Sequence, residues 1–284
     1  MKSLLVALAL LALATSCSTE SSTPSNTPNP NLLQRVDINL NSLQEQRLLF
    51  NSDGLLDTIT TAGGVLLKTF SYDSQNNLLT HTSYELPTPY TDAFTYDASN
   101  HIISVNNEPV TYDAVENKYT IDYAFFNTYE YLDKTEVTLN ADLMLLTEQQ
   151  LWISADGNFA LNGVSSGYVS QNLSGYYDGV AGEGNYTYDT HSNPLKAALL
   201  PICRAMCLTN FRNAHNKWIN GMYCSANNMT SNDYDLEGPE KSVYIYEFNS
   251  LSLPTQQTTE SYYLGVLEDT RISAKYYYQG DVLP

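Results

Sequence analysis

The segment 70–79, FSYDSQNNLL, contains the signals that decide the fold. An aromatic residue ends one apolar stretch, Tyr-Asp and a polar run follow, and Leu78 begins the next apolar stretch. The Asp73 side chain can bond the turn backbone two residues further on, and Asn76 tolerates the left-handed conformation that a chain reversal requires. The segment therefore predicts a strand, a tight turn and a second strand.

Related segments recur along the chain and predict a series of hairpins. They are 50–56, 96–102 and 188–195, with a weaker copy at 248–254. Short strands at close spacing, separated by such turns, are typical of antiparallel meanders. We therefore predict a mainly β fold, an extended or rolled antiparallel β-meander sheet built from hairpin repeats.

One segment, at about 196–220, breaks the β pattern and predicts a helical insertion. Pro201 is suited to the first turn of a helix and Gly221 to its end. Residues at spacings of three and four form one helical stripe, through which we expect the helix to dock on the sheet. The stripe consists of Cys207, Phe211, Ala214, Trp218 and Met222.

The N-terminal residues predict export and lipid anchoring. Lys2 precedes a short apolar run that is too short to span a bilayer, so it is interpreted as a signal peptide over 1–16. Small residues leading to Cys17 resemble the lipobox of bacterial lipoproteins, in which the Cys is lipidated after cleavage. An ordinary secretory signal with an incidental Cys17 is the alternative. A flexible Ser/Thr/Pro tether over 17–31 and a single β domain over 32–284 follow.

The charge balance limits the partners. The chain has 31 acidic and 13 basic residues, a net charge of −18, which argues against nucleic acid. No second apolar run of membrane length follows the signal, so we expect a soluble body held at the membrane through Cys17.

The repeats resemble the YD repeats of RHS-type proteins, whose successive hairpins build one long sheet, although the usual Gly-Arg of the turn is missing. Together with Cys17, the segments YTYD 186–189, NPLK 193–196 and NNMT 227–230 are similar to uncharacterised envelope lipoproteins of the Bacteroidota. The resemblance implies an outer-membrane lipoprotein of the cell envelope, facing the periplasm or the outside. It implies no catalytic residues.

Three cysteines lie in or just after the predicted helix: Cys203, Cys207 and Cys224. In an oxidising compartment a disulfide is the first interpretation. Cys203 and Cys207 are one helical turn apart and do not readily bridge, so Cys224 is the expected partner of one of them. The alternatives are reduced core thiols, or a zinc site that includes His215.

An acidic segment after the helix has the opening of a calcium loop. Asp233, Asp235 and Glu237 supply oxygen atoms at positions one, three and five, but Tyr244 stands where the usual loop has a bidentate Glu. A solvated acidic turn is the favoured interpretation, and we expect no metal or other cofactor.

Basic residues gather in the same region. Two interpretations are open: these residues contact anionic lipid head groups, or they form a solvated face of the helix. The second is favoured. The basic residues are Lys196, Arg204, Arg212 and Lys217.

The residue types predict a binding or structural role rather than an enzyme. The 23 tyrosines suit a sheet with one wet face, and rows of exposed Tyr would also suit recognition of a glycan, a peptide or a partner protein. No nucleophile, phosphate-loop or metalloprotease motif is present in the sequence. A carrier of a hydrophobic ligand in a half-open β-barrel is the alternative, and a hydrolase with dispersed carboxylates is a further one.

Overall fold

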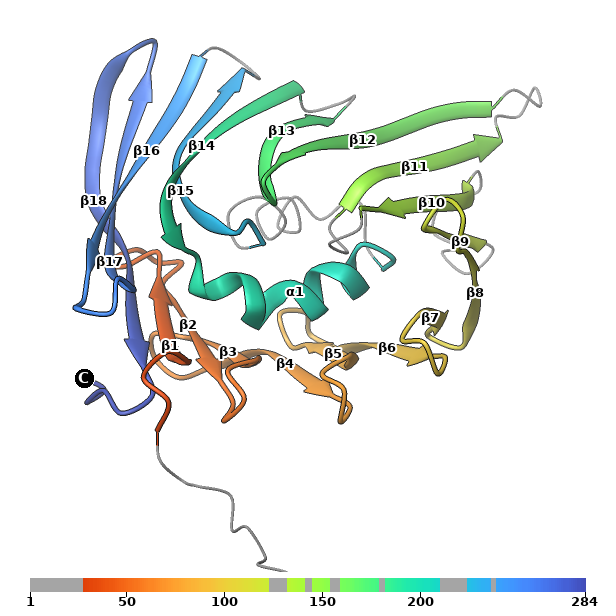
Figure 1. Ribbon diagram of the computed structural model, residues 1–284, viewed down its shortest axis with the longest axis horizontal. Helices are drawn as coiled ribbons and strands as arrows, with labels where there is room; N and C mark the ends of the chain where they lie inside the picture. The colour runs from red at the N-terminus through yellow and green to blue at the C-terminus, as the bar shows by residue number, and fades with distance from the viewer. Residues whose placement is uncertain are drawn as a thin grey trace, which may run out of the picture.

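The computed structural model describes residues 28–122, 132–140, 145–153, 159–178, 182–209, 224–235 and 239–284. These residues form eighteen strands and one helix, α1 (Figure 1). The signal peptide, Cys17 and most of the tether lie outside the described residues. The strands are β1 (Leu33–Ile38), β2 (Gln46–Phe50), β3 (Leu56–Thr61), β4 (Leu66–Tyr72), β5 (Leu78–Ser83), β6 (Tyr90–Tyr96), β7 (Ile102–Val105), β8 (Glu108–Asp113), β9 (Lys118–Asp122), β10 (Leu132–Leu139), β11 (Leu145–Ile153), β12 (Phe159–Val169), β13 (Asn172–Asp178), β14 (Gly182–Ser192), β15 (Asn227–Asp235), β16 (Pro239–Phe248), β17 (Pro254–Tyr263) and β18 (Val266–Tyr278).

The strands form a single antiparallel meander. Each strand pairs with the next along the chain, as β4 does with β5 through Phe70↔His81. The last strand, β18, pairs back with β1 through Val36↔Tyr276, so the sheet is rolled until its first and last strands meet. The predicted rolled antiparallel meander is confirmed.

The repeat turns share one hydrogen-bonded geometry. Oδ1 of Asp73 accepts from the N–H groups of Gln75 and Asn77 at 2.8 and 2.9 Å. The residue three positions after the side-chain acceptor has a left-handed backbone conformation, with φ of 65° at Asn76. The same pair of bonds forms at Asn51, Asp97 and Asn249. The copy at 248–254, which looked weaker in sequence, therefore folds in the same way, with Ser252 in the left-handed position.

Tyrosine hydroxyls join each repeat to the one before it. The hydroxyl of Tyr72 donates to the carbonyl of Leu56, and that of Tyr96 donates to the carbonyl of Leu78 at 2.8 Å. Each acceptor is the first residue of the strand that follows the preceding turn. Burial raises the pKa of both hydroxyls, so they remain protonated donors. The Tyr that precedes Asp in these two repeats thus has a structural use.

The Asp97 turn predicts a local pH dependence of stability. The hydrogen bond from the backbone N–H of His101 is the largest cause that lowers the pKa of Asp97. Its stabilising effect is therefore present above the unfolded pKa, about 3.9, and is lost as the pH falls through the lower folded pKa. In Asp97→Asn the amide oxygen can accept the same bonds, as Asn51 does, without titrating.

Urea unfolding should therefore show that the wild type loses more free energy of unfolding than Asp97→Asn when the pH is lowered from 6 to 3. Asp97→Ala, which removes the acceptor, should be less stable than both at pH 6. A wild type to Asp97→Asn difference that is the same at both pH values would contradict the prediction.

Helix α1 covers Pro194–Met206 and differs from its predicted bounds. Asn193 caps it, because its side chain accepts from the N–H of Leu195 at 3.0 Å and Pro194 occupies the first turn. Pro201 lies inside the helix rather than at its start, and the chain leaves the helix at Cys207. The part of the stripe from Phe211 onward lies outside the described residues. Among the described helices, none has the length and apolar character needed to cross a membrane.

The helix lies within the rolled sheet and completes its core (Figure 1). Its buried face packs in one cluster with inward side chains of β18 and of β1 to β10. Leu199 and Ile202 of the helix, for example, share this cluster with Phe70 and Phe94 of the sheet. A sheet rolled around a helix in this way buries apolar area on its inner side along most of its strands.

Candidate ligand-binding pocket

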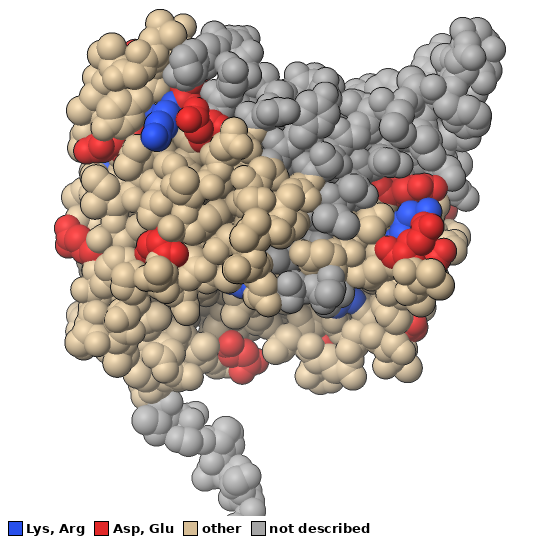
Figure 2. Space-filling model, turned by 45° about the horizontal axis from the view of Figure 1, so that its top comes forward, with Lys and Arg blue, Asp and Glu red and all other residues tan. Residues whose placement is uncertain are grey.

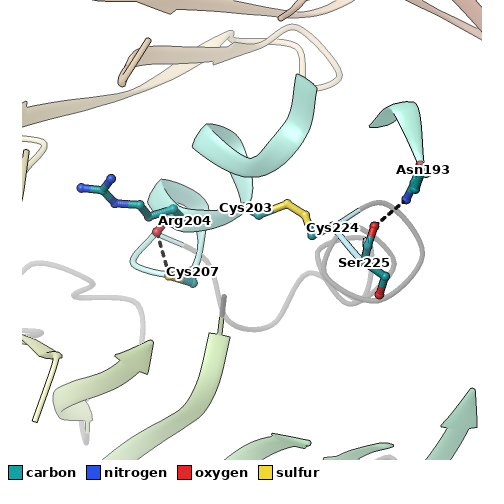
Figure 3. The surroundings of a disulfide bond; sticks show 6 residues. All are labelled: Asn193, Cys203, Arg204, Cys207, Cys224 and Ser225. Atoms are coloured by element: carbon teal, nitrogen blue, oxygen red, sulfur yellow. Dashed lines mark hydrogen bonds between the residues drawn. A yellow bond between two sulfur atoms is a disulfide. The ribbon is translucent and has the colours of Figure 1, made fainter. Parts of the chain in front are cut away.

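The structure bonds Cys203 of α1 to Cys224, ahead of β15 (Figure 3). Cys207 takes no part in this disulfide, and its Sγ donates to the carbonyl of Arg204 at 2.8 Å. The amide of Asn193 also donates to the carbonyl of Ser225 at 3.1 Å, so the cap and the disulfide hold the same two segments together. His215, the imidazole of the zinc alternative, lies outside the described residues. No group of three or more His, Cys, Asp or Glu in the described ranges is placed to hold a metal ion.

At the first two residues of the acidic segment the structure contradicts both the favoured solvated turn and the calcium-loop alternative. Asp233 and Asp235 belong to β15 and pair in regular antiparallel register with Lys241 and Pro239. An extended ladder cannot curl its side chains around one ion as a loop does. Glu237 lies outside the described residues.

The basic residues of this region do not share one face in the part of the chain that the structure describes. Lys196 donates to the side chain of Gln171 at 2.6 Å. The guanidinium of Arg204 lies over the ring of Tyr96, 5.8 Å from its centroid, on the inner side of the sheet. Arg212 and Lys217 lie outside the described residues.

A pocket forms where the strands β15 to β18 come together. Its lining residues come from β15, β16 and β17 and from the turn between β17 and β18: Asp233, Lys241, Val243, Tyr262 and Gly265. The strand register aligns Asp233 with Lys241 and Lys241 with Tyr262, which places the three side chains in one row on one face. Gly265 has φ of 78° and nothing within 4 Å of the position of a Cβ, so the turn leaves the mouth of the pocket open.

The tyrosine ring of the pocket is held in place. The hydroxyl of Tyr262 donates to Oε2 of Glu260 at 2.6 Å. This hydrogen bond is the main reason that the pKa of Tyr262 is raised, so the hydroxyl remains protonated. The hydrogen bond thereby orients the half-buried ring at the wall of the pocket.

The charges of the lining balance. Asp233 and Lys241 are cross-strand neighbours, but no ion pair between described residues uses either side chain. Figure 2 shows oppositely charged side chains next to each other over the C-terminal strands at the upper left. The pocket therefore combines an acceptor, a donor and an aromatic ring without a net charge of its own.

The pocket lies at the end of the sheet opposite the tether. The N-terminal segment enters at β1, where Leu33 pairs with Tyr278 at the end of β18. Gly265 precedes the start of β18, 13 residues earlier, which corresponds to about 40 Å along an extended strand. In Figure 1 the coloured residues ahead of β1 lie in the lower part of the picture, and the β17–β18 hairpin lies at the top.

The chemistry of the pocket suits a neutral ligand with hydroxyl groups. A sugar offers hydroxyls to Asp233 and Lys241 and an apolar face of C–H groups to the ring of Tyr262. Strand addition by a peptide needs a free sheet edge, whereas every described strand pairs on both sides. The geometry therefore favours recognition by side chains.

Sequence reasoning missed most of these residues. It selected Asp233, but for metal binding, and selected none of Lys241, Val243 or Gly265. The tyrosine-rich segments indicated a binding face, yet hydroxyls such as those of Tyr72 and Tyr96 are used inside the fold. Only the register of β15 to β17 brings the pocket row together.

Comparison with known proteins identifies no family. No family model matches the sequence, and no curated protein is significantly similar. A porin-like protein from Bacteroides uniformis has a TM-score of 0.34 and 12% identity, with 89% of this chain and 99% of that chain covered. A porin-like protein from Bacteroides vulgatus has a TM-score of 0.27 and 9% identity, with 70% of this chain and 97% of that chain covered. Values this low neither establish a shared fold nor transfer a function.

Proposed function

We propose that this protein is a lipid-anchored, non-enzymatic component of the cell envelope that binds a glycan in the pocket of Tyr262. Lipidation at Cys17 would hold the protein at the outer membrane, and the tether would follow it. The observation that carries the proposal is the row of Asp233, Lys241 and Tyr262 on a face far from the tether. A binding site at that end would remain accessible while the other end stays near the lipid.

Two further observations support binding over the alternatives. The inner side of β1 to β10 packs against α1 in one core, which leaves a hydrophobic ligand less room than a half-open carrier needs. The carboxylates whose pKa is lowered, Asp73 and Asp97, lie in repeat turns, where hydrogen bonds from the turn account for the shift. Their role is to stabilise hairpins.

The test is calorimetric titration of the full chain, carrying Cys17→Ala to avoid lipidation, with maltohexaose, cellohexaose and chitohexaose. We expect one of these to bind and Tyr262→Ala to weaken that binding at least tenfold, because the ring face is lost. Tyr84→Ala, which truncates an exposed tyrosine that does not line the pocket, should leave the affinity unchanged. Absence of binding by all three oligosaccharides, or equal effects of the two substitutions, would overturn the proposal.

A further inference from the structure

Exposed apolar side chains continue from the pocket along the same face of the sheet. Val243 lines the pocket, and Ile245 follows it two residues later on β16. Ile245 pairs with Thr258, which in turn pairs with Ile272 of β18. Ile245 and Ile272 are 49% and 37% exposed. We call Val243, Ile245 and Ile272 the apolar track.

The track starts at the wall of the pocket rather than beside it. Lys241, Val243 and Ile245 alternate along β16 and therefore point to one side. From Lys241 to Ile245 the strand advances about 13 Å. Glu260 flanks this path, and its carboxylate is turned toward the hydroxyl of Tyr262. At the other rim, Leu267 pairs with Tyr262 and is 50% exposed.

On β4 to β7 the outward face of the sheet carries paired hydroxyl groups. Phe70 and Phe94 point into the core, so their neighbours Ser71 and Thr95 point outward. Hydroxyl pairs cover this face on successive strands: Ser71 with Thr80, Thr82 with Thr91, and Thr95 with Ser104. A bulge between Gln257 and Thr258 likewise turns Ile272 to the side opposite the core residue Ala274. The apolar track therefore contrasts with the hydroxyl pairs of β4 to β7.

We propose that the pocket and the apolar track together bind one amphiphilic molecule, a saccharide that carries an acyl or alkyl chain. This inference rests on the proposed glycan-binding function and narrows its ligand class. The opposite charges of Asp233 and Lys241 cancel, which suits a neutral sugar. The track offers the acyl or alkyl chain an apolar surface that would otherwise face water. Val243 belongs to both parts, so a chain attached to the bound sugar leaves the pocket directly onto Ile245.

The experiment compares methyl and octyl β-glucoside, and methyl and octyl β-maltoside, below the micelle concentration, on the full chain carrying Cys17→Ala. We expect the octyl compound of a pair to bind at least tenfold more tightly than the methyl compound. The double substitution Ile245→Thr with Ile272→Thr gives this face the hydroxyls found elsewhere and keeps the β-branched shape. It should reduce the gain below threefold and leave the methyl glycoside affinity unchanged. Ile103→Thr, at an exposed isoleucine of β7, is the matched control and should retain the full gain.

The outcomes separate the two proposals. Equal affinity for methyl and octyl glycosides would overturn the amphiphile and leave the glycan-binding function in place. Absence of binding by all four glycosides, together with failure of the hexasaccharides, would overturn both. Octyl phosphocholine serves as a chain without a sugar. If it binds as tightly as the octyl glycosides, the pocket does not recognise the sugar head group and the inference is wrong.

Discussion

Replacing Asp37 by alanine is expected to lower the free energy of unfolding by about 3–5 kcal/mol, because it leaves a buried charge without its partner. Nε of Arg35 donates to Oδ1 of Asp37 at 2.6 Å, and a second guanidinium nitrogen donates to Oδ2 at 2.5 Å. The two side chains are only 7% and 5% exposed. The hydrogen bond to Asp37 is the largest cause that raises the pKa of Arg35, and this effect is lost with Asp37. The guanidinium still stays charged after the substitution, because arginine is not deprotonated in proteins.

The position of the pair makes this effect global. Arg35 and Asp37 lie on β1, the strand that joins the end of the meander, β18, to its beginning, β2. The ring of Tyr277 on β18 lies 5.3 Å from the guanidinium. Loss of Asp37 therefore leaves the guanidinium at the seam where the sheet meets itself, with only the Tyr277 ring and a long hydrogen bond of 3.5 Å to the carbonyl of Pro284 among the described residues. We expect unfolding to start there.

A double substitution tests this reason for the loss. Arg35→Met with Asp37→Leu removes both charges, and it should restore most of the stability that Asp37→Ala loses, since apolar side chains of similar size can replace a buried ion pair. Glu85→Gln, in the partly exposed pair of Lys68 and Glu85, should cost less than about 1 kcal/mol. Urea unfolding followed by circular dichroism measures all three. A double variant as unstable as Asp37→Ala would show that the pair, rather than the stranded charge, carries the stability.

Local features of the fold could be predicted from sequence because they depend on neighbouring residues. The turn at Asp73 needs only a side-chain acceptor, a left-handed residue and an apolar strand after it, all within a few residues. The predicted start of the helix, about residue 196, lies two residues from its observed start, but the residue in its first turn is Pro194 and not Pro201. Pro201 is accommodated inside a helix whose buried face packs in the core.

Long-range features could not be predicted in this way. Closure of the sheet depends on the pairing of β1 with β18, for example of Val36 with Tyr276. The residues near either strand give no indication of which strand it pairs with. The pocket depends on the register of β15, β16 and β17, which sets which residues stand in one row. A shift of one residue in a strand would turn Lys241 to the opposite face and remove the site. The residues that line the pocket therefore cannot be told from ordinary strand residues in the sequence.

Replacing Ile202 by alanine is expected to lower the free energy of unfolding by about 2–5 kcal/mol. Truncating a fully buried side chain removes its apolar contacts and leaves a cavity in the core. Ile202 is 1% exposed and belongs to the core cluster that α1 shares with the sheet. The size of the effect measures whether the sheet depends on the helix that it surrounds. If the sheet were stable on its own, the helix could loosen with little loss of strand structure.

The matched control is Ile103→Ala on β7, where the side chain is 44% exposed and the same atoms are removed from a partly solvated site. It should cost less than about 1 kcal/mol. Urea unfolding monitored by the circular dichroism of the strands gives both values. A loss below 1 kcal/mol for Ile202→Ala, or equal losses at the two isoleucines, would mean that α1 occupies the rolled sheet without supporting it. A large loss at Ile202 alone would mean that helix and sheet fold as one unit, so that the pocket at β15 to β18 depends on the helix that precedes it in the chain.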